Sequence, residues 1–327
     1  MKKIRFLAAC AAALGLITVC LTGCGQGTSR MMFGTGGTAG TYYSYGGVIA
    51  QYMTSYADVK VTAVSTGASK VNIQSIEDGD FQLGFTQSDV MAYAWDGTKS
   101  FEQDGPTHAF RVLGGLYAET VQLITMDPAI RTVEDLKGKS VSIGAAGSGT
   151  YFNAIDVLSA AGITLKDIHP QYQSFEDSKE SLKDGKIDAA FIVAGAPTTA
   201  ITELATTNGV YLLNIDGALR DEIMSECPYY TALEIPAGTY PGQDAPVETI
   251  TVKATIIVSA DLPEDTVYRM TAAIFDHAED IAKENAKGAE LSLDTATTGM
   301  AAPFHEGAAR YYREYGITVK TDGEDER

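Results

Sequence analysis

The chain has 327 residues, of which 45% are hydrophobic and 20% are charged, and its mean hydropathy is close to zero. This composition excludes a disordered acidic tail and a polytopic membrane protein, and the length suggests about two domains. Lys and Arg number 24 against 42 Asp and Glu, which gives a formal net charge of −18. Because phosphate binding needs concentrated basic side chains, this acidic surplus argues against a nucleic-acid partner.

The beginning of the chain has the features of an export signal. Lys2, Lys3 and Arg5 precede an apolar run over residues 6–21. This run is short for a bilayer core, which needs about 20 residues, and no basic stop-transfer cluster follows it. The pattern therefore favours a cleaved signal peptide. The motif Leu21-Thr-Gly-Cys24 resembles the lipobox of bacterial lipoproteins, in which cleavage before the cysteine leaves its sulfur bearing a diacylglycerol; the alternative is a plain signal peptide.

The four cysteines are explained by this signal. Cys10 and Cys20 would leave with the signal peptide, and Cys24 would be the lipid attachment site. Cys227 is then the single cysteine left for the folded part. An exported protein with one free cysteine has no internal disulfide and no cysteine-built metal site.

The predicted mature protein is strongly acidic. Removing the signal peptide, residues 1–23, takes away three basic groups, so the net charge becomes 21 − 42 = −21. Such a chain is not drawn electrostatically to anionic lipid, and the lipid itself would be the anchor. Residues 24–30 would form a short lipidated tether, which places the protein outside the cytoplasm at the cell membrane.

A repeated plan of strand, glycine-rich turn and helix occurs twice in the chain. Both turns close with Gly-Thr-Tyr followed by an aromatic residue, at residues 40–43 and 149–152. Further along each repeat, Gly79 and Gly185 stand where a helix would end before a buried apolar strand. The repeat favours two similar α/β lobes, and convergence of common turns is the alternative.

Two β-rich runs, 112–126 and 248–258, can carry the chain from one lobe to the other and back. A helix is expected after the second run, capped by Asp261 or a neighbour, with Pro263 in its first turn and its end near residue 286. A final helix is expected from about residue 303 to 315. The chain would thus return to its first lobe.

The sequence therefore predicts an α/β protein with two lobes and a two-strand hinge, which would place a ligand cleft between the lobes. The expected parts are a discontinuous lobe 1, a lobe 2 and an acidic tail, at residues 31–118 with 254–317, residues 119–253, and residues 318–327.

Enzyme signatures are weak. The four histidines show no metal-ligand spacing, so neither a metal site nor a cofactor is predicted. Gly34-x-Gly36-x-x-Ala39 fits a dinucleotide fingerprint, but the acidic ribose anchor expected about 20 residues further on is missing. Ser148 is flanked by glycines, and the sequence places no base beside it. An enzyme on the same bilobal scaffold stays open as an alternative.

Three turns that lead into helices, at residues 34–41, 65–69 and 144–150, offer a binding site for an anion. Free main-chain N–H groups and the helix dipole favour negative charge at such positions, and glycines allow close approach. None of the turns contains an arginine or an acid, so a solute carboxylate would be held by N–H and hydroxyl groups. Gln87 could serve an amide, an amine or a second carboxylate, or could cap a neighbouring loop. The serines and threonines could also be simple N-caps.

Seven motifs spread over residues 31–316 together resemble the TAXI family, the extracytoplasmic solute-binding receptors of tripartite ATP-independent periplasmic (TRAP) transporters. They are Gly34-Thr-Gly-Gly-Thr-Ala-Gly-Thr-Tyr-Tyr43, Ser65-Thr-Gly67, Phe85-Thr-Gln-Ser-Asp89, Thr132-Val-Glu-Asp-Leu-Lys-Gly-Lys139, Gly147-Ser-Gly-Thr150, Ile235-Pro-Ala-Gly-Thr-Tyr240 and Gly307-Ala-Ala-Arg-Tyr-Tyr312. Two segments, 303–307 and 191–197, depart from the usual family pattern.

This resemblance implies a type II periplasmic-binding-protein fold that closes on a small solute and delivers it to a TRAP-type membrane permease. Members of the family resemble glutamate or glutamine binders, so a carboxylate-bearing, glutamate- or glutamine-like solute is expected. A ligand-sensing or surface lipoprotein without a transport role is the alternative. The implied ligand contacts are Thr38, Tyr42, Ser65, Gln87, Ser148, Gly149 and Thr150.

Overall fold

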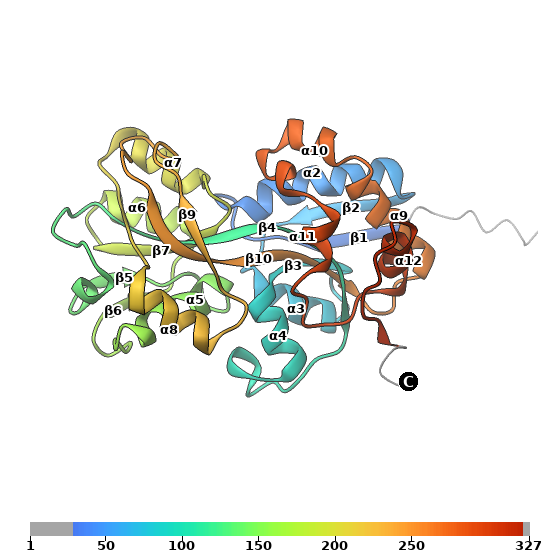
Figure 1. Cartoon of the computed structure of the whole chain (residues 1–327), viewed down its shortest axis with the longest axis horizontal. Helices are drawn as coiled ribbons and strands as arrows, with labels where there is room; N and C mark the ends of the chain where they lie inside the picture. The colour runs from blue at the N-terminus through green and yellow to red at the C-terminus, as the bar shows by residue number, and fades with distance from the viewer. Residues whose placement is uncertain (1–28, 323–327) are drawn as a thin grey trace, which may run out of the picture.

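A ten-stranded sheet runs through the described chain, residues 29–322, in the computed structural model (Figure 1). The order across the sheet is β2-β1-β3-β10-β4-β7-β5-β6, with β8 beside β4 and β9 beside β10. The strands are β1 (Ser29–Gly34), β2 (Val59–Val64), β3 (Leu83–Gln87), β4 (Phe110–Thr125), β5 (Ser140–Ser142), β6 (His169–Gln171), β7 (Ala189–Ala194), β8 (Tyr211–Leu213), β9 (Thr231–Ile235) and β10 (Val247–Ser259).

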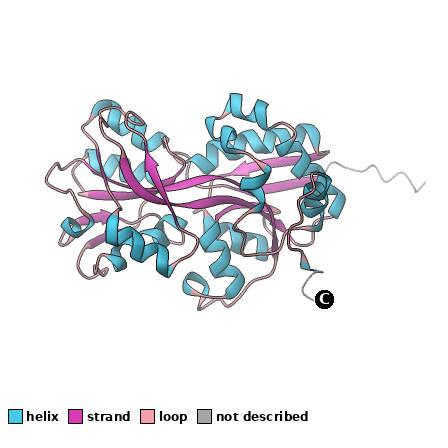
Figure 2. Cartoon of the chain, viewed as in Figure 1, coloured by secondary structure: helices cyan, strands magenta, loops and turns pink. Residues whose placement is uncertain are grey.

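Helices cover both faces of this sheet (Figure 2). The α-helices are α2 (Thr41–Tyr56), α3 (Ser69–Glu77), α4 (Ser88–Asp96), α5 (Gly149–Ala160), α6 (Phe175–Lys183), α7 (Thr199–Thr207), α8 (Gly217–Glu226), α9 (Glu264–Phe275), α10 (Ala278–Glu284), α11 (Leu293–Thr297) and α12 (Glu306–Glu314). Short 3₁₀ turns are η1 (Lys99–Phe101), η2 (Val133–Leu136) and η3 (Ala286–Glu290). Because helices lie on both faces, β3 and β7 are buried along their whole length, which explains the continuous apolar sequence of β7.

The two long strands β4 and β10 join two lobes (Figure 1). The first part of β4 pairs with the end of β10, whereas its last part, Thr120–Thr125, pairs with β7. The end of β10 also pairs with β3, and its beginning pairs with β9. Each long strand thus lies in one lobe at one end and in the other lobe at the other end. The predicted α/β class with two lobes and two connecting strands is confirmed.

Parallel strands in each lobe point their carboxyl ends toward the junction between the lobes. In the first lobe β1 is parallel to β2 and β3, and in the second β5 is parallel to β6 and β7. Ligands of open α/β sheets bind beyond the carboxyl ends of such strands. The turns that lead from these strands into α2, α3, α5 and α6 therefore meet between the lobes.

Two helices near the C-terminus differ from the sequence prediction. The helix expected to run to about residue 286 is broken between α9 and α10, because His277 adopts a non-helical conformation, φ −112° and ψ 19°, and stacks on Tyr56 with ring centroids 3.8 Å apart. Pro263, and not Asp261, is the N-cap of α9. The last helix begins three residues later than expected, at Glu306, because His305 caps it.

Helices α9 and α12 approach each other so closely at Gly307 that a side chain does not fit. A Cβ atom there would overlap the carbonyl oxygen of Glu264 and lie 2.6 Å from the main-chain nitrogen of Tyr268. We expect Gly307→Ala to lower the free energy of unfolding by about 1–3 kcal/mol, because the two helices must separate. Urea denaturation followed by circular dichroism measures this change.

Gly47→Ala is the matched control. Gly47 lies on the exposed side of α2, and nothing lies within 4 Å of an added Cβ. Since alanine is the better helix former, this variant should raise the free energy of unfolding by about 0.5–1 kcal/mol. A stabilising effect of Gly307→Ala would contradict the packing described here.

Candidate functional site

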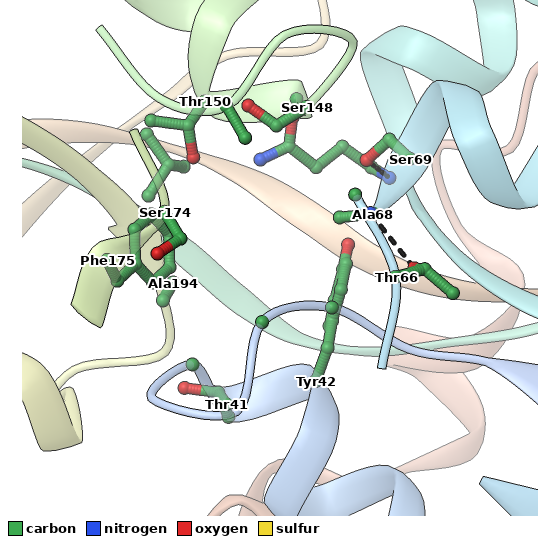
Figure 3. Close-up of a pocket in the computed structure, with 18 of the residues that line it drawn as sticks. Thr41, Tyr42, Thr66, Ala68, Ser69, Ser148, Thr150, Ser174, Phe175 and Ala194 are labelled. Atoms are coloured by element: carbon green, nitrogen blue, oxygen red, sulfur yellow. Dashed lines mark hydrogen bonds between the residues drawn. The ribbon is translucent and has the colours of Figure 1, made fainter. Parts of the chain in front are cut away.

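A cavity of about 80 Å³ lies between the lobes at the carboxyl ends of the parallel strands (Figure 3). The N-cap residues of five helices line it. They are Gly40 of α2, Ala68 of α3, Gln87 of α4, Ser148 of α5 and Ser174 of α6. The first N–H groups of a helix have no partner within the helix, and the helix dipole is positive there. Five such helix starts around one cavity favour a bound anion.

Charged side chains are scarce in this cavity. No lysine, arginine or histidine is among the described residues that line it, and Glu119 is the one carboxylic acid. A solute carboxylate here would meet main-chain N–H groups, amides and hydroxyls. A cavity of this size holds a few water-sized groups, which suits a small solute.

Five of the seven residues expected to contact the ligand line the cavity: Tyr42, Gln87, Ser148, Gly149 and Thr150. Tyr42 points from α2 into the cavity, and Ser148 and Thr150 lie on the opposite side (Figure 3). The ring of Tyr42 is held by stacking on Phe85, with centroids 4.5 Å apart. The Ser148 hydroxyl also accepts a hydrogen bond from the nitrogen of Tyr151 at 3.1 Å, so it is an N-cap as well as a cavity residue.

The other two expected contacts, Thr38 and Ser65, are not part of this lining. Thr38 is exposed in the turn before α2. Ser65 is also exposed, and its hydroxyl donates to the carbonyl oxygen of Gly36 at 2.9 Å. Ser65 therefore joins two of the glycine-rich turns and does not face the cavity.

Glu119 is a cavity residue that the sequence prediction missed. It lies where β4 crosses between the lobes, opposite Val252 of β10, and is 2% exposed. Its Oε2 accepts a hydrogen bond from Gln87 Nε2 at 2.9 Å, and its Oε1 accepts a longer one from the Tyr117 hydroxyl at 3.4 Å. Burial raises the pKa of Glu119 to about 8. An acid in the middle of a long β-rich run was the available sequence signal.

A second buried acid, Asp89, lies beside the cavity at the beginning of α4. Its Oδ2 accepts a hydrogen bond from Nδ2 of Asn153, on α5 of the other lobe, at 2.9 Å. The same nitrogen donates to the Tyr230 hydroxyl, which in turn donates to Asp156 at 3.0 Å. Burial raises the pKa of Asp89 to about 7, and the charge of Asp156 adds to the shift. A polar network therefore spans the two lobes here.

The lobes touch each other on several sides of the cavity. The Thr41 hydroxyl of one lobe donates to the carbonyl oxygen of Gly195 of the other at 3.2 Å, and Lys99 and Asp156 form an ion pair at 3.1 Å. Gly149 packs directly on the side chain of Gln87, where a Cβ atom would overlap the amide. The structure is thus a closed arrangement of the two lobes.

Two lobes, two shared strands and a cavity at the carboxyl ends of the strands define a type II periplasmic-binding-protein fold. The chain matches the model of the NMT1-like family over residues 33–316, and it belongs to that family.

Solved structures of similar fold include a protein from Bordetella bronchiseptica RB50, with 16% sequence identity and a TM-score of 0.55 over 89% of this chain and 90% of that one. PhnD1 from Prochlorococcus marinus, solved in complex with methylphosphonate, is 11% identical with a TM-score of 0.52 over 78% of this chain and 89% of that one. At these identities the likeness concerns the fold.

Two further observations concern the membrane and metal ions. Within residues 29–322, no helix combines the length and the apolar character that a bilayer crossing requires. The same residues contain no cluster of three or more His, Cys, Asp or Glu side chains arranged to hold a metal ion. The predicted signal peptide, residues 1–23, and the predicted lipid attachment site Cys24 lie outside the described residues, whereas Cys227 is buried and free.

The buried acids should make the stability of the solute-free protein depend on pH. Because the pKa of Glu119 is higher in the folded protein than in the unfolded chain, the folded state keeps a proton that the unfolded chain has lost between about pH 4.5 and pH 8. The contribution of protonated Glu119 to the free energy of unfolding is therefore lost as the pH rises toward 8. Between pH 5 and pH 8 the free energy of unfolding should fall by about 2–4 kcal/mol more in the wild type than in Glu119→Gln.

Urea unfolding at both pH values measures this difference. Glu234→Gln, at an exposed position of β9, is the control and should keep the slope of the wild type. Equal slopes for the wild type and Glu119→Gln would show that Glu119 is already ionised in the folded protein.

Proposed function

We propose that this protein is an extracytoplasmic, lipid-anchored receptor that binds a small carboxylate-bearing solute, glutamate- or glutamine-like, and delivers it to a TRAP-type membrane permease. The observation that carries this proposal is the meeting of five helix N-caps around one interlobe cavity whose described lining has no basic side chain. Such a site binds an anion through main-chain dipoles. Membership of the NMT1-like family and the two-lobed fold agree with a receptor.

Solute capture would proceed by lobe closure. We assign residues 31–118 and 254–317 to one lobe and residues 119–253 to the other, with β4 and β10 as the hinge. Tyr42 and Gln87 then contact the solute from the first lobe, and Ser148, Gly149 and Thr150 from the second. A solute that touches both lobes stabilises only the closed form, so binding shifts the population toward closure.

A hydrolytic enzyme on the same scaffold fits the site less well. Ser148 is the best nucleophile in the cavity, but its hydroxyl oxygen is engaged as the N-cap of α5. A serine nucleophile needs an adjacent base, and no histidine lies among the described cavity residues. The geometry therefore favours binding over catalysis.

Gly149→Ala should weaken solute binding without unfolding the protein. The new methyl group would overlap the Gln87 amide, which is held by Glu119, and so would keep the lobes apart. We expect the Kd for glutamate or glutamine to rise by at least about tenfold, which corresponds to 1.4 kcal/mol. Calorimetry on protein that has been unfolded and refolded to remove bound solute measures the Kd.

Gly47→Ala is the control for this experiment and should bind like the wild type. An unchanged Kd in Gly149→Ala would contradict the site assignment. If glutamate, glutamine and dicarboxylates all fail to bind the wild type at millimolar concentration, the assigned solute class is wrong.

Coupling to a TRAP-type permease predicts uptake driven by an ion gradient. In cells that express this protein, an ionophore should abolish solute uptake, and depletion of ATP with the gradient maintained should leave it intact. Cys24→Ala should release the protein from the membrane fraction while solute binding is retained, because the lipid would be the anchor. Solute uptake that requires ATP and continues after the ion gradient is removed would contradict the TRAP assignment.

A further inference from the structure

Gln87, Glu119 and Tyr42 form what we call the floor of the cavity. The polar atoms of this floor that lack a good hydrogen-bond partner can all accept hydrogen bonds. Gln87 is 2% exposed, its Nε2 donates to Glu119, and its Oε1 has no partner among the described residues. The hydroxyl of Tyr42, which faces Glu119, is buried without a partner as well. Glu119 Oε1 has only the long 3.4 Å hydrogen bond from Tyr117. A buried acceptor left unpaired costs about 1–3 kcal/mol, so this floor fits a group that donates several hydrogen bonds.

The walls of the cavity thus favour an anionic group, whereas the floor favours a group that donates hydrogen bonds. The walls are helix starts, where N–H groups favour negative charge. The floor presents one carboxyl group, one amide oxygen and one hydroxyl oxygen. An ammonium group has three N–H donors and no acceptor, which matches these three oxygens. A solute with a carboxylate at the walls and an ammonium at the floor would satisfy both sets.

We propose that Glu119 is the specificity-determining residue of the site: it pairs with an ammonium group of the solute, while Gln87 Oε1 and the Tyr42 hydroxyl accept its remaining N–H bonds. The site then selects zwitterionic amino acids over dicarboxylates that lack nitrogen. This inference rests on the proposed solute-binding function and narrows its substrate class.

Binding of an ammonium group would also release a proton. Several groups face Glu119: Tyr42 from α2, the Gln87 amide from β3, Asp89 from α4 and Tyr117 from β4. In the solute-free closed site, burial and the nearby charge of Asp89 raise the pKa of Glu119 to about 8, although the Gln87 amide and the nearby hydroxyls of Tyr42 and Tyr117 oppose the shift. The carboxyl group is then protonated at pH 7. A bound cation favours the carboxylate, so the proton passes to solvent and the ion pair forms.

Because binding releases a proton from Glu119, the affinity for the solute should depend on pH. Because the ion pair needs the carboxylate, the affinity for an amino acid should fall as the pH is lowered below about 8, by up to about tenfold per pH unit. A dicarboxylate without nitrogen should show the opposite trend, since it is repelled by the carboxylate and accepted by the neutral acid.

Glutamate and glutarate are the matched probes, because they differ only in the ammonium group. Calorimetry on the full chain, purified in detergent and freed of solute, gives both Kd values at pH 6, 7 and 8. We expect glutamate to bind at least about 100-fold more tightly than glutarate at pH 8, and its Kd to rise about tenfold from pH 7 to pH 6. Repeating the pH 7 titration in buffers of different ionisation enthalpy should show release of about one proton.

Glu119→Gln tests the residue directly. It should raise the Kd for glutamate at pH 8 by at least about tenfold and remove both the pH dependence and the proton release. Glu234→Gln, with its exposed side chain on β9, should behave like the wild type. A Glu119→Gln variant with the affinity and pH dependence of the wild type would overturn the proposal.

The other possible results of these titrations distinguish a failure of this proposal from a failure of the receptor function. Glutarate that binds as tightly as glutamate at pH 8 overturns the role of Glu119 and leaves the receptor function standing. If neither probe binds, mass spectrometry of solute released by unfolding freshly purified protein decides: an amine-bearing solute supports the proposal, and one without an amine overturns it. No released solute, together with no binding, counts against the receptor function as well.

Discussion

The sharing of β4 and β10 between the lobes is the constraint on which the rest of the structure depends. Because the two strands pair with each other where they cross, at Thr120 with Thr251 and Glu119 with Val252, they fix the floor of the interlobe cavity. The parallel strands of both lobes point their carboxyl ends at this floor. Helices that follow such strands must begin there, so the topology itself gathers five helix N-caps around the cavity.

The anion binding proposed for this cavity has to be local, because the protein as a whole is acidic. The chain carries a formal net charge of −18, which repels anions at a distance, but charges are screened beyond about 8 Å at physiological salt. Helix starts act over only one turn, and here they lie at the cavity wall. Long-range repulsion from the acidic surface and short-range attraction from the main chain at the cavity would therefore act on the proposed solute at different distances.

The sequence allowed the α/β class, the two lobes and five of the residues that line the cavity to be predicted, because apolar strands and glycine-rich turns leave local patterns. It could not show which hydroxyl of a turn faces inward: Ser65 bonds to Gly36, a contact that only the fold creates. Glu119 was missed because its partner, Gln87, is 32 positions away in the chain. The break between α9 and α10 was missed for the same reason, since it depends on the stacking of His277 on Tyr56, far apart in sequence.

The position of Glu119 at the floor also bears on the resting state of the empty protein. Opening the lobes would let water reach the carboxyl group and restore a pKa near its ordinary value of 4.5, whereas the closed site holds it near 8. Closing an empty site at pH 7 is therefore coupled to the uptake of about one proton, and opening it releases that proton again. A single buried acid would in this way make the movement of the two lobes respond to the pH of the surroundings.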